Sequence, residues 1–153
     1  MWLSSAWCNA ALHFTASDGK LEIVRLLLNN GANPNIMDND GDNCLEYAIA
    51  KDHSLIVKLL LENKIEIRDA LHQVAKTGNL DIANLILNNG VNINEKNKDD
   101  LTALYIATQN GHLELVKLFL ENGADKSISD KDGKTPMDIA SEKAYLEIEK
   151  LFN

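Results

Sequence analysis

The sequence has few cysteines, few basic residues and no long apolar segment. Its two cysteines, Cys8 and Cys44, are too few for the disulfide framework of a small secreted protein. A reducing, cytoplasmic location is the simplest interpretation. No apolar run approaches the roughly 18 residues of a membrane-spanning helix, and residues 1–7 lack the basic and long apolar segments of a signal peptide.

The charge balance excludes two classes of partner. The chain has 15 basic and 23 acidic residues, which gives a net charge of −8. A protein that binds nucleic acid without regard to sequence needs an excess of positive charge to contact the phosphates. Attraction to an anionic membrane surface has the same requirement. We therefore expect neither nucleic acid nor a membrane as a partner.

The length and composition are those of one globular domain spanning residues 1–153. Hydrophobic residues make up 45% and charged residues 25%, which is enough apolar material for a core and excludes a disordered acidic tail. The chain has 13 lysines but 2 arginines, together with 18 asparagines and 13 isoleucines. This bias favours an AT-rich genome, such as that of an intracellular bacterium, a protist or a large DNA virus, although repeats that reuse the same residues would produce it too.

An internal repeat is the most informative feature. The segment Leu26–Asn33 (LLLNNGAN) returns as Leu85–Asn92 (LILNNGVN) and Leu118–Asp125 (LFLENGAD), and in degraded form as Leu59–Glu66 (LLLENKIE). A second motif precedes each copy and is anchored at Leu12, Leu45, Leu71 and Leu104, with Met137 in a fifth unit. The anchors are 33, 26, 33 and 33 residues apart. A period of 33 residues is that of the ankyrin repeat.

Specific motifs carry the resemblance to the ankyrin-repeat family from about Asn9 onward. Asp132–Ala140 (DGKTPMDIA) is similar to the family's D-G-x-T-P-L-H-x-A, and Thr102–Lys117 follows its helix pair almost throughout. The resemblance implies an all-α solenoid of five helix-turn-helix repeats with short β-hairpin connectors. The repeats span approximately residues 8–37, 38–66, 67–96, 97–129 and 130–153.

The apolar pattern predicts the same helices without the family. Ala103, Leu104 and Ala107 share one helical face, and Gly111 and Gly123 fit the turn and the helix end that follow. The expected inner helices are 10–17, 44–51, 70–77, 103–110 and 136–142, and the outer helices are 21–29, 54–62, 80–88, 113–121 and 145–152. Leu59, Leu85 and Leu118 are expected at equivalent core positions. A single helix pair cannot bury its apolar face, so the pairs must stack.

The 26-residue step predicts a truncated connector between repeats two and three. Only Lys64–Asp69 joins the two helix pairs there, which is too short for a projecting hairpin. We expect a direct link with Ile65 or Ile67 buried and Asp69 capping the next helix. The missing hairpin is either a tolerated loop deletion or a notch that admits part of a partner.

The two ends of the array suggest caps. Glu149 stands where other repeats carry Val24, Val57, Ala83 or Val116, which is typical of a polar outer face. Trp2, Leu3 and Trp7 precede the first repeat and could cover its exposed edge. Alternatively, the chain belongs to a longer array or meets a second copy of itself.

No constellation of residues indicates catalysis, a metal or a cofactor. The resemblance implies structural roles for His13, His53, His72 and His112, and small partly buried thiols for the cysteines. The acidic stretch Asp38–Asp42 has Ile49 where a calcium loop needs its bidentate Glu. Asn35 and Asn94 resemble the asparagine that some animal ankyrin repeats present to a hydroxylase, although a turn-forming asparagine is the simpler interpretation. We expect no enzyme, no cofactor and no metal.

We expect a monomeric, non-catalytic module that binds a protein partner. The resemblance implies a concave binding surface made of hairpin tips and inner helices, with Leu101 as its apolar anchor. The bias toward lysine, asparagine and isoleucine adds the hypothesis of a pathogen or viral effector delivered to a host cytosol. The alternative is structural self-assembly by end-to-end stacking through Trp2, Trp7, Leu151 and Phe152. The candidate partner-binding residues are Asn39, Asp40, Asp42, Lys51, Lys76, Thr77, Lys98, Asp99, Leu101, Gln109, Asn110, Lys131, Asp132 and Lys134.

Overall fold

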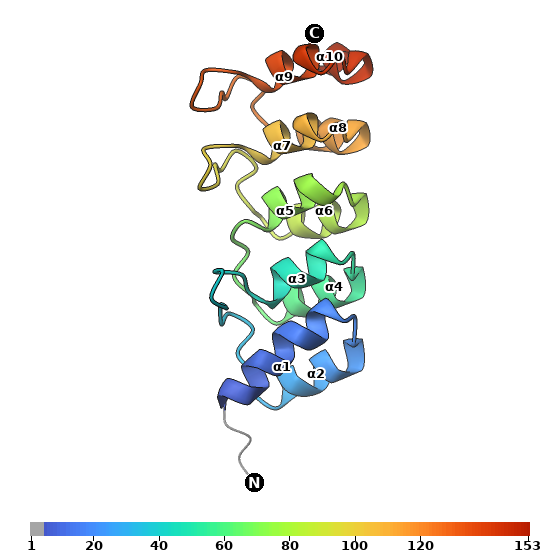
Figure 1. Ribbon diagram of the computed structural model, residues 1–153. Helices are drawn as coiled ribbons and strands as arrows, with labels where there is room; N and C mark the ends of the chain where they lie inside the picture. The colour runs from blue at the N-terminus through green and yellow to red at the C-terminus, as the bar shows by residue number, and fades with distance from the viewer. Residues whose placement is uncertain (1–4) are drawn as a thin grey trace. The chain divides into compact units, whose positions relative to one another are not determined.

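The computed structural model describes residues 5–153, and side chains from Ala10 onward. This part of the chain forms ten α-helices in five antiparallel pairs, which group into unit 1 (Met1–Ala70) and unit 2 (Leu71–Asn153) (Figure 1). The helices of unit 1 are α1 (Ser5–Ser17), α2 (Leu21–Asn29), α3 (Cys44–Ala50) and α4 (Ser54–Glu62). Those of unit 2 are α5 (Ala70–Thr77), α6 (Leu80–Leu87), α7 (Ala103–Gln109), α8 (Leu113–Glu121), α9 (Pro136–Glu142) and α10 (Leu146–Phe152).

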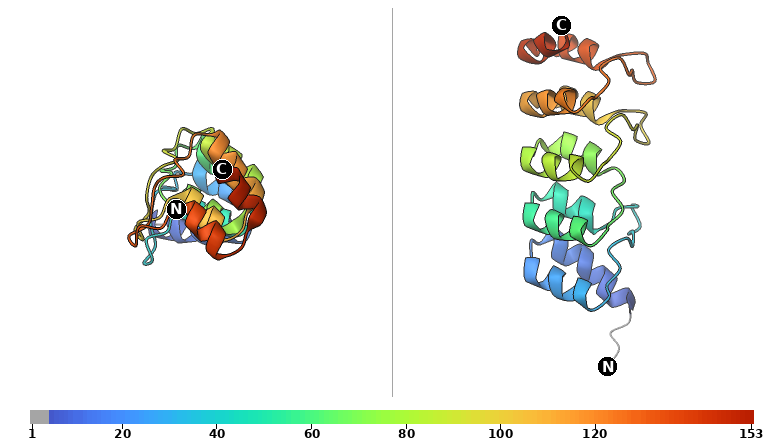
Figure 2. Two further views of the ribbon diagram at one scale, coloured as in Figure 1. Left: turned by 90° about the horizontal axis from the view of Figure 1, so that it is seen from above. Right: turned by 180° about the vertical axis from the view of Figure 1, so that it is seen from behind.

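Within each unit the pairs stack in register. In unit 1 the inner helices α1 and α3 pack together, and the outer helices α2 and α4 lie side by side; in unit 2, α7 packs on α9, and α8 lies between α6 and α10 (Figure 2). The predicted all-α repeat fold is confirmed, and nine helices agree with their expected bounds to within one residue. The exception is α1, which begins at Ser5 rather than residue 10. The predicted cap of Trp2, Leu3 and Trp7 lies outside the described side chains.

Local hydrogen bonds explain where the inner helices begin. The side chain of Asn43 accepts from Leu45 N, and Glu46 accepts from Asn43 N in return, so that two otherwise unpaired backbone donors at the start of α3 are satisfied. Thr135 and Asp138 form the same capping box at the start of α9. Each box fixes the point at which the connector ends, and therefore the place from which the connector turn projects.

The core follows the repeat, with one correction. Val24, Val57, Ala83 and Val116 are fully buried, as their register predicts. Leu59 is buried as predicted, but Leu85 and Leu118 are only half-buried, so these two are not the core residues that the pattern suggested. The fully buried position of that turn is one residue later, at Leu60, Ile86 and Phe119. In a short outer helix the apolar stripe is wider than the surface that the neighbouring helices cover, so periodicity alone places the buried centre one residue too early.

The regular connectors are tight turns with little β structure. The described residues contain no β-strand. The one isolated β-bridge among them is antiparallel and pairs Lys96 with Thr102. The turns at residues 38–42, 97–101 and 130–134 share one hydrogen-bond pattern, in which the first residue donates its N–H to the carbonyl of the fifth at 2.9–3.0 Å. The β-hairpins expected from the resemblance are thus reduced here to their turns, and only the turn at residues 97–101 is flanked by a β-bridge among the described residues.

The truncated connector is a direct link, as predicted. Residues 63–69 contain no strand, and Ile65 is buried while Ile67 is half-exposed. The link is held at Glu66, whose N–H donates to Asn35 Oδ1 at 2.8 Å and whose carbonyl accepts from Asn43 Nδ2 at 3.4 Å. The preceding connector therefore fixes the course of this link without a hairpin.

Candidate binding site

The three connector turns are held rigidly by one polar side chain each. Asp38 Oδ1 accepts the N–H groups of Asp40 and Asp42 at 2.9 and 3.1 Å, and Asp130 Oδ1 accepts those of Asp132 and Lys134, both at 2.9 Å. Asn97 holds the third turn in the same way, at 2.9 and 3.1 Å. A side-chain oxygen that accepts two backbone donors limits the conformations of the turn. The turn surfaces are therefore pre-formed.

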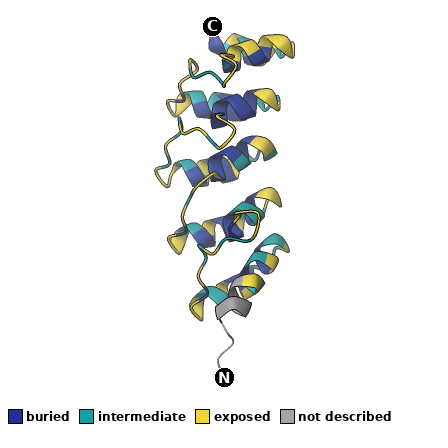
Figure 3. Cartoon of the chain, turned by 60° about the vertical axis from the view of Figure 1, so that its left-hand side comes forward, coloured by how far each residue is buried: buried dark blue, intermediate teal, exposed yellow. Residues whose placement is uncertain are grey.

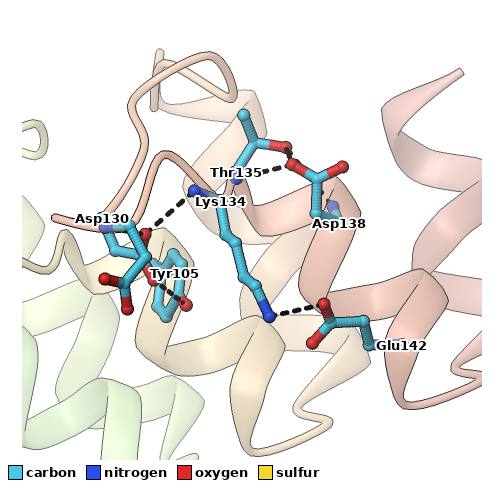
Figure 4. Close-up of polar contacts among 7 residues, drawn as sticks. Tyr105, Asp130, Lys134, Thr135, Asp138 and Glu142 are labelled. Carbon is cyan, nitrogen blue, oxygen red and sulfur yellow. Dashed lines mark hydrogen bonds and ion pairs between the residues drawn. The ribbon is translucent and has the colours of Figure 1, made fainter.

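Two of these turns are also tied to an inner helix by tyrosine. Tyr47 donates its hydroxyl to Asp38 Oδ2 at 2.5 Å, and Tyr105 donates to Asp130 Oδ2 at 2.6 Å (Figure 4). These bonds lower the pKa of both carboxyl groups, because they favour the charged form. The bond to Asp38 raises the pKa of Tyr47 to about 12. Burial, followed by the bond to Asp130, raises the pKa of Tyr105 as well.

A second set of contacts holds the last connector to α9. Lys134 Nζ donates to Glu142 Oε1 at 2.6 Å, and Thr135 Oγ1 donates to Asp138 Oδ2 at 2.7 Å (Figure 4). The hydrogen bond and charge of Glu142 raise the pKa of Lys134. Lys134 was predicted as a partner-binding residue, and the structure shows that part of its bonding capacity already stabilises its own connector.

The predicted binding residues of the turns lie at the surface, with one exception. The side chains of Asn39, Asp40 and Asp42 in unit 1 are exposed, as are the following residues of unit 2: Lys98, Asp99, Lys131, Asp132 and Lys134. Leu101 is half-buried and lies at the base of its turn, where its N–H donates to Asn97 and its carbonyl accepts from Asn97 N–H. The expected exposed apolar tip is therefore corrected, because the turn closes at Leu101 and leaves residues 98–100 outermost.

The predicted residues of the inner helices cluster at helix ends. Lys51, Lys76, Gln109 and Asn110 are exposed, and Thr77 is half-buried. Lys51 follows α3 directly, Lys76 and Thr77 are the last two residues of α5, and Gln109 and Asn110 lie at the end of α7. Burial is concentrated on the facing sides of the helices, while the connectors and helix ends are mostly exposed (Figure 3). Each unit thus brings exposed turns and inner-helix ends to its surface.

Unit 1 contains an apolar groove that the sequence did not reveal. A cavity of about 640 Å³ lies between α1, the first connector and α3. It is lined by Ala10, His13, Phe14, Ser17, Ile36, Met37, Asp38 and Tyr47. The side chain of Phe14 is 70% exposed. By register Phe14 corresponds to Gln73, Ile106 and Ile139 in unit 2. Ile106 and Ile139 are buried and Gln73 is half-buried, so register alone does not predict that Phe14 is exposed.

The histidines have the structural roles that the resemblance implied. His53 Nε2 lies 3.0 Å from the carbonyl of Ser17, and His112 Nε2 lies 3.0 Å from that of Lys76, so each links a helix pair to the one before it. His72 Nε2 lies 2.9 Å from the carbonyl of Glu95 in the next connector. The ring of His13 meets that of Tyr47 edge-on, with centroids 5.9 Å apart.

Asn35 and Asn94 also bond to the backbone. Asn35 Oδ1 accepts from Glu66 N and Asn94 Oδ1 accepts from Asp125 N, at 2.8 and 2.7 Å. Each asparagine therefore joins one connector to the start of the next.

The described residues offer little for nucleophilic catalysis or metal binding. Burial raises the pKa of the Cys44 thiol to about 12, which keeps it protonated and unreactive at neutral pH. Over residues 5–153, histidines, cysteines and carboxylates do not gather in any group of three able to hold a metal ion. Within the same residues, every helix is too short or too polar to cross a membrane. The side chain of Cys8 lies outside the described part.

Comparison with known proteins agrees with this architecture. Residues 3–70 and 71–152 each match the family described as ankyrin repeats (3 copies). The chain is 33% identical over 104 residues to an ankyrin repeat protein of fowlpox virus (strain NVSL), which covers 63% of this chain and 72% of the viral protein. It is 31% identical over 101 residues to potassium channel AKT2/3 of Arabidopsis thaliana and 31% identical over 107 residues to the nuclear factor NF-kappa-B p105 subunit of Gallus gallus. Each match covers 63% of this chain, but the chain spans only 13% and 11% of those two proteins. Since the family match extends over nearly the whole chain, the protein belongs to the ankyrin-repeat family.

Proposed function

We propose that this protein is a non-catalytic module that binds a protein partner through its connector turns and inner helices. Ankyrin repeats generally act as protein–protein interaction modules, and the finer assignment concerns which face of this chain makes the contact. The observation that supports the connector side is the fixed geometry of the turns. Asp38, Asn97 and Asp130 each hold two backbone donors, so exposed residues are presented on a rigid frame.

Rigidity matters because ordering a flexible loop on binding reduces affinity. Immobilising a side chain or loop costs about 0.5–1.5 kcal/mol for each rotamer-rich side chain. Turns that are already ordered avoid the backbone share of this cost. The exposed turn residues of unit 2 carry both signs of charge, Lys98 and Lys131 beside Asp99 and Asp132. Such a surface favours a partner that matches the charges residue by residue over one that carries a single sign.

The viral relative supports one extension of this proposal. An ankyrin repeat protein of fowlpox virus resembles this chain, and the excess of lysine, asparagine and isoleucine is typical of an AT-rich genome. Both favour an effector of a pathogen or virus that acts on a host protein in the host cytoplasm. Expression in cultured cells with a fluorescent tag, followed by imaging and fractionation, tests the location.

Self-assembly by end-to-end stacking is the second candidate. Ile23 and Leu26 of α2 are exposed, whereas their register equivalents Ile56 and Leu59 are buried, so this face of the first pair could accept another repeat. The proposed contact at the other end is weaker than expected, because Phe152 is buried within unit 2. Sedimentation velocity at micromolar concentration distinguishes the two candidates, since a monomer contradicts stacking.

A pair of charge-reversal variants tests the proposed binding face. Lys98→Glu with Lys131→Glu changes two exposed turn residues of unit 2, and Lys117→Glu with Lys150→Glu makes the same charge change on its outer helices α8 and α10. A partner is first captured from a lysate and identified, and its affinity for the purified variants is then measured. The turn variant should weaken binding about tenfold or more, while the outer-helix variant should not. The reverse result would move the site to the outer helices.

Equal loss in the two variants would indicate long-range attraction instead of a local contact. Long-range attraction between exposed charges fades as salt is raised, because the screening length falls to about 8 Å at physiological ionic strength. Repeating both measurements at high salt separates the cases. A local contact leaves the turn variant weaker than the wild type at high salt, whereas under long-range attraction the losses of both variants disappear as salt is raised.

A further inference from the structure

We infer that the groove of unit 1 binds an extended segment of a partner protein in which one apolar side chain is flanked by lysine or arginine. This inference rests on the proposed function and specifies the chemistry of the partner at one place. The groove is formed by the residues of α1, the first connector and α3 named above, and is called the α1 groove. Its volume of about 640 Å³ lies within the range of about 300–1,000 Å³ typical of ligand sites.

The wall of the α1 groove is mainly apolar and aromatic. Phe14 and Ala10 contribute from α1, Ile36 and Met37 from the connector, and Tyr47 from α3. Phe14 is the decisive residue, because an aromatic side chain that is 70% exposed forgoes most of the stabilisation that burial would provide. Of the corresponding side chains in unit 2, Ile106 and Ile139 are buried and Gln73 is half-buried. The groove is therefore open at a position that the last two repeats fill.

The polar atoms of the wall are mostly committed to the fold. Asp38 uses one carboxylate oxygen for the turn and the other for the Tyr47 hydroxyl. His13 packs edge-on against the Tyr47 ring. These contacts hold the groove open and in shape before a partner arrives. A segment entering it meets an apolar surface of fixed shape, which suits an aliphatic or aromatic side chain.

The charge beside the groove has one sign. Between Arg25 and Lys51 the sequence contains four carboxylates and no basic residue. Two of the four, Asp40 and Asp42, have exposed side chains on the turn that begins at Asp38. The charges of both act on Tyr47 in the groove wall, so they form an acidic rim beside the groove. The turns of unit 2 differ, because lysine and aspartate alternate there. An apolar groove with an acidic rim complements a segment that is apolar at its centre and basic at its flanks.

Four labelled nonapeptides test this specificity directly. Their central residue is leucine or serine, and the flanking residues are lysine or glutamate, in all four combinations. Binding to the full chain is measured by fluorescence anisotropy. The peptide with leucine between lysines should bind at least about tenfold more tightly than each of the other three, and its affinity should fall as salt is raised. Equal affinity for all four peptides, or no binding of any, would overturn the inference.

Matched variants locate the bound peptide. Phe14→Ala should weaken binding about tenfold or more, whereas Leu26→Ala, which removes a side chain that is 61% exposed on α2, should not. Asp40→Lys with Asp42→Lys should also abolish the preference for lysine flanks. The same charge change on the outer helices, Glu62→Lys with Glu121→Lys, should preserve it. Thermal melts of the variants confirm that each remains folded.

Two other molecules or segments that would fit the groove, a second copy of the chain and the chain's own first residues, are tested by the same variants. Wild-type chains that self-associate in sedimentation velocity, and become monomeric on Phe14→Ala, would place a second copy in the groove and overturn the inference. Peptide binding that appears only after deletion of residues 1–4 would place the chain's own first segment there, with the same consequence. Failure of this inference can be distinguished from failure of the proposed function. The proposed function is tested with Lys98 and Lys131 of unit 2 and a captured protein, whereas the inference is tested with labelled peptides and residues of unit 1.

Discussion

Gly78 should be among the least replaceable residues on the surface of unit 2. It follows α5 with a backbone φ of +83°, and the ring of His112 in the next helix pair lies directly against it. A Cβ atom added at Gly78 would lie 2.8 Å from two atoms of that ring. Gly90 has a similar φ of +77°, but a Cβ there would meet nothing within 4 Å. The two glycines therefore separate the cost of the backbone conformation from the cost of the contact.

The two costs can be worked from the structure. Alanine in the left-handed region costs about 1–2 kcal/mol, partly offset by about 0.4–1 kcal/mol from the less flexible unfolded chain. Gly90→Ala should therefore lower the free energy of unfolding by about 1 kcal/mol. Gly78→Ala adds the displacement of the His112 ring, whose Nε2 lies 3.0 Å from the Lys76 carbonyl. Losing that bond costs about 0.5–1.5 kcal/mol and overpacking about 1–3 kcal/mol, so Gly78→Ala should cost about 2.5–5.5 kcal/mol in all.

Urea denaturation followed by circular dichroism measures both variants, with the slope of unfolding checked for constancy. A double-mutant cycle isolates the contact, because His112→Ala removes the ring that a Cβ at residue 78 would strike. In that background Gly78→Ala should cost about as much as Gly90→Ala. Equal costs for Gly78→Ala and Gly90→Ala in the otherwise unchanged chain would refute the reasoning. A coupling energy of zero between residues 78 and 112 would refute it as well.

Three further predictions follow from burial and pKa shifts. Ile86→Ala should lower the free energy of unfolding by about 2–5 kcal/mol because it leaves a cavity, whereas half-buried Leu85→Ala should cost about 1 kcal/mol; the opposite order in urea melts would contradict the observed register. In a Cys8→Ser background, Cys44 should resist a thiol reagent at mildly alkaline pH until urea unfolds the chain, because burial raises its pKa to about 12; rapid labelling of the folded protein would mean that the thiol is accessible. The pKa of Tyr47 is raised from 10.0 to about 12, so the stability that its hydroxyl contributes is complete below pH 10 and lost as the pH rises toward 12. Thermal melts across this range should show a steeper loss for the wild type than for Tyr47→Phe, and parallel curves would exclude the bond to Asp38 as the cause.

The sequence by itself determined the helices and their order. A 33-residue spacing of leucine anchors, with glycines at the turns, places nine of the ten described helices to within one residue. It also located the truncated connector, because a 26-residue step between intact helix pairs must come from the connector. These features are local: helix propensity, capping and chain length act within one repeat, so a single repeat carries the information.

Only the tertiary structure decided which of the repeated positions are buried and which are open. Leu85 and Ile86 lie on the same apolar stripe, and the packing of the neighbouring helices makes Ile86 the core residue. Leu101 was expected at a tip, but the turn closes on Asn97 and places it at the base. Tyr47 bonds to the connector before it and Tyr105 to the connector after it, although both belong to inner helices. Phe14 and Ile106 share a register position, yet one borders an open groove and the other is buried. A repeat fixes the direction in which a side chain points, but its exposure depends on what the adjacent repeat places opposite it.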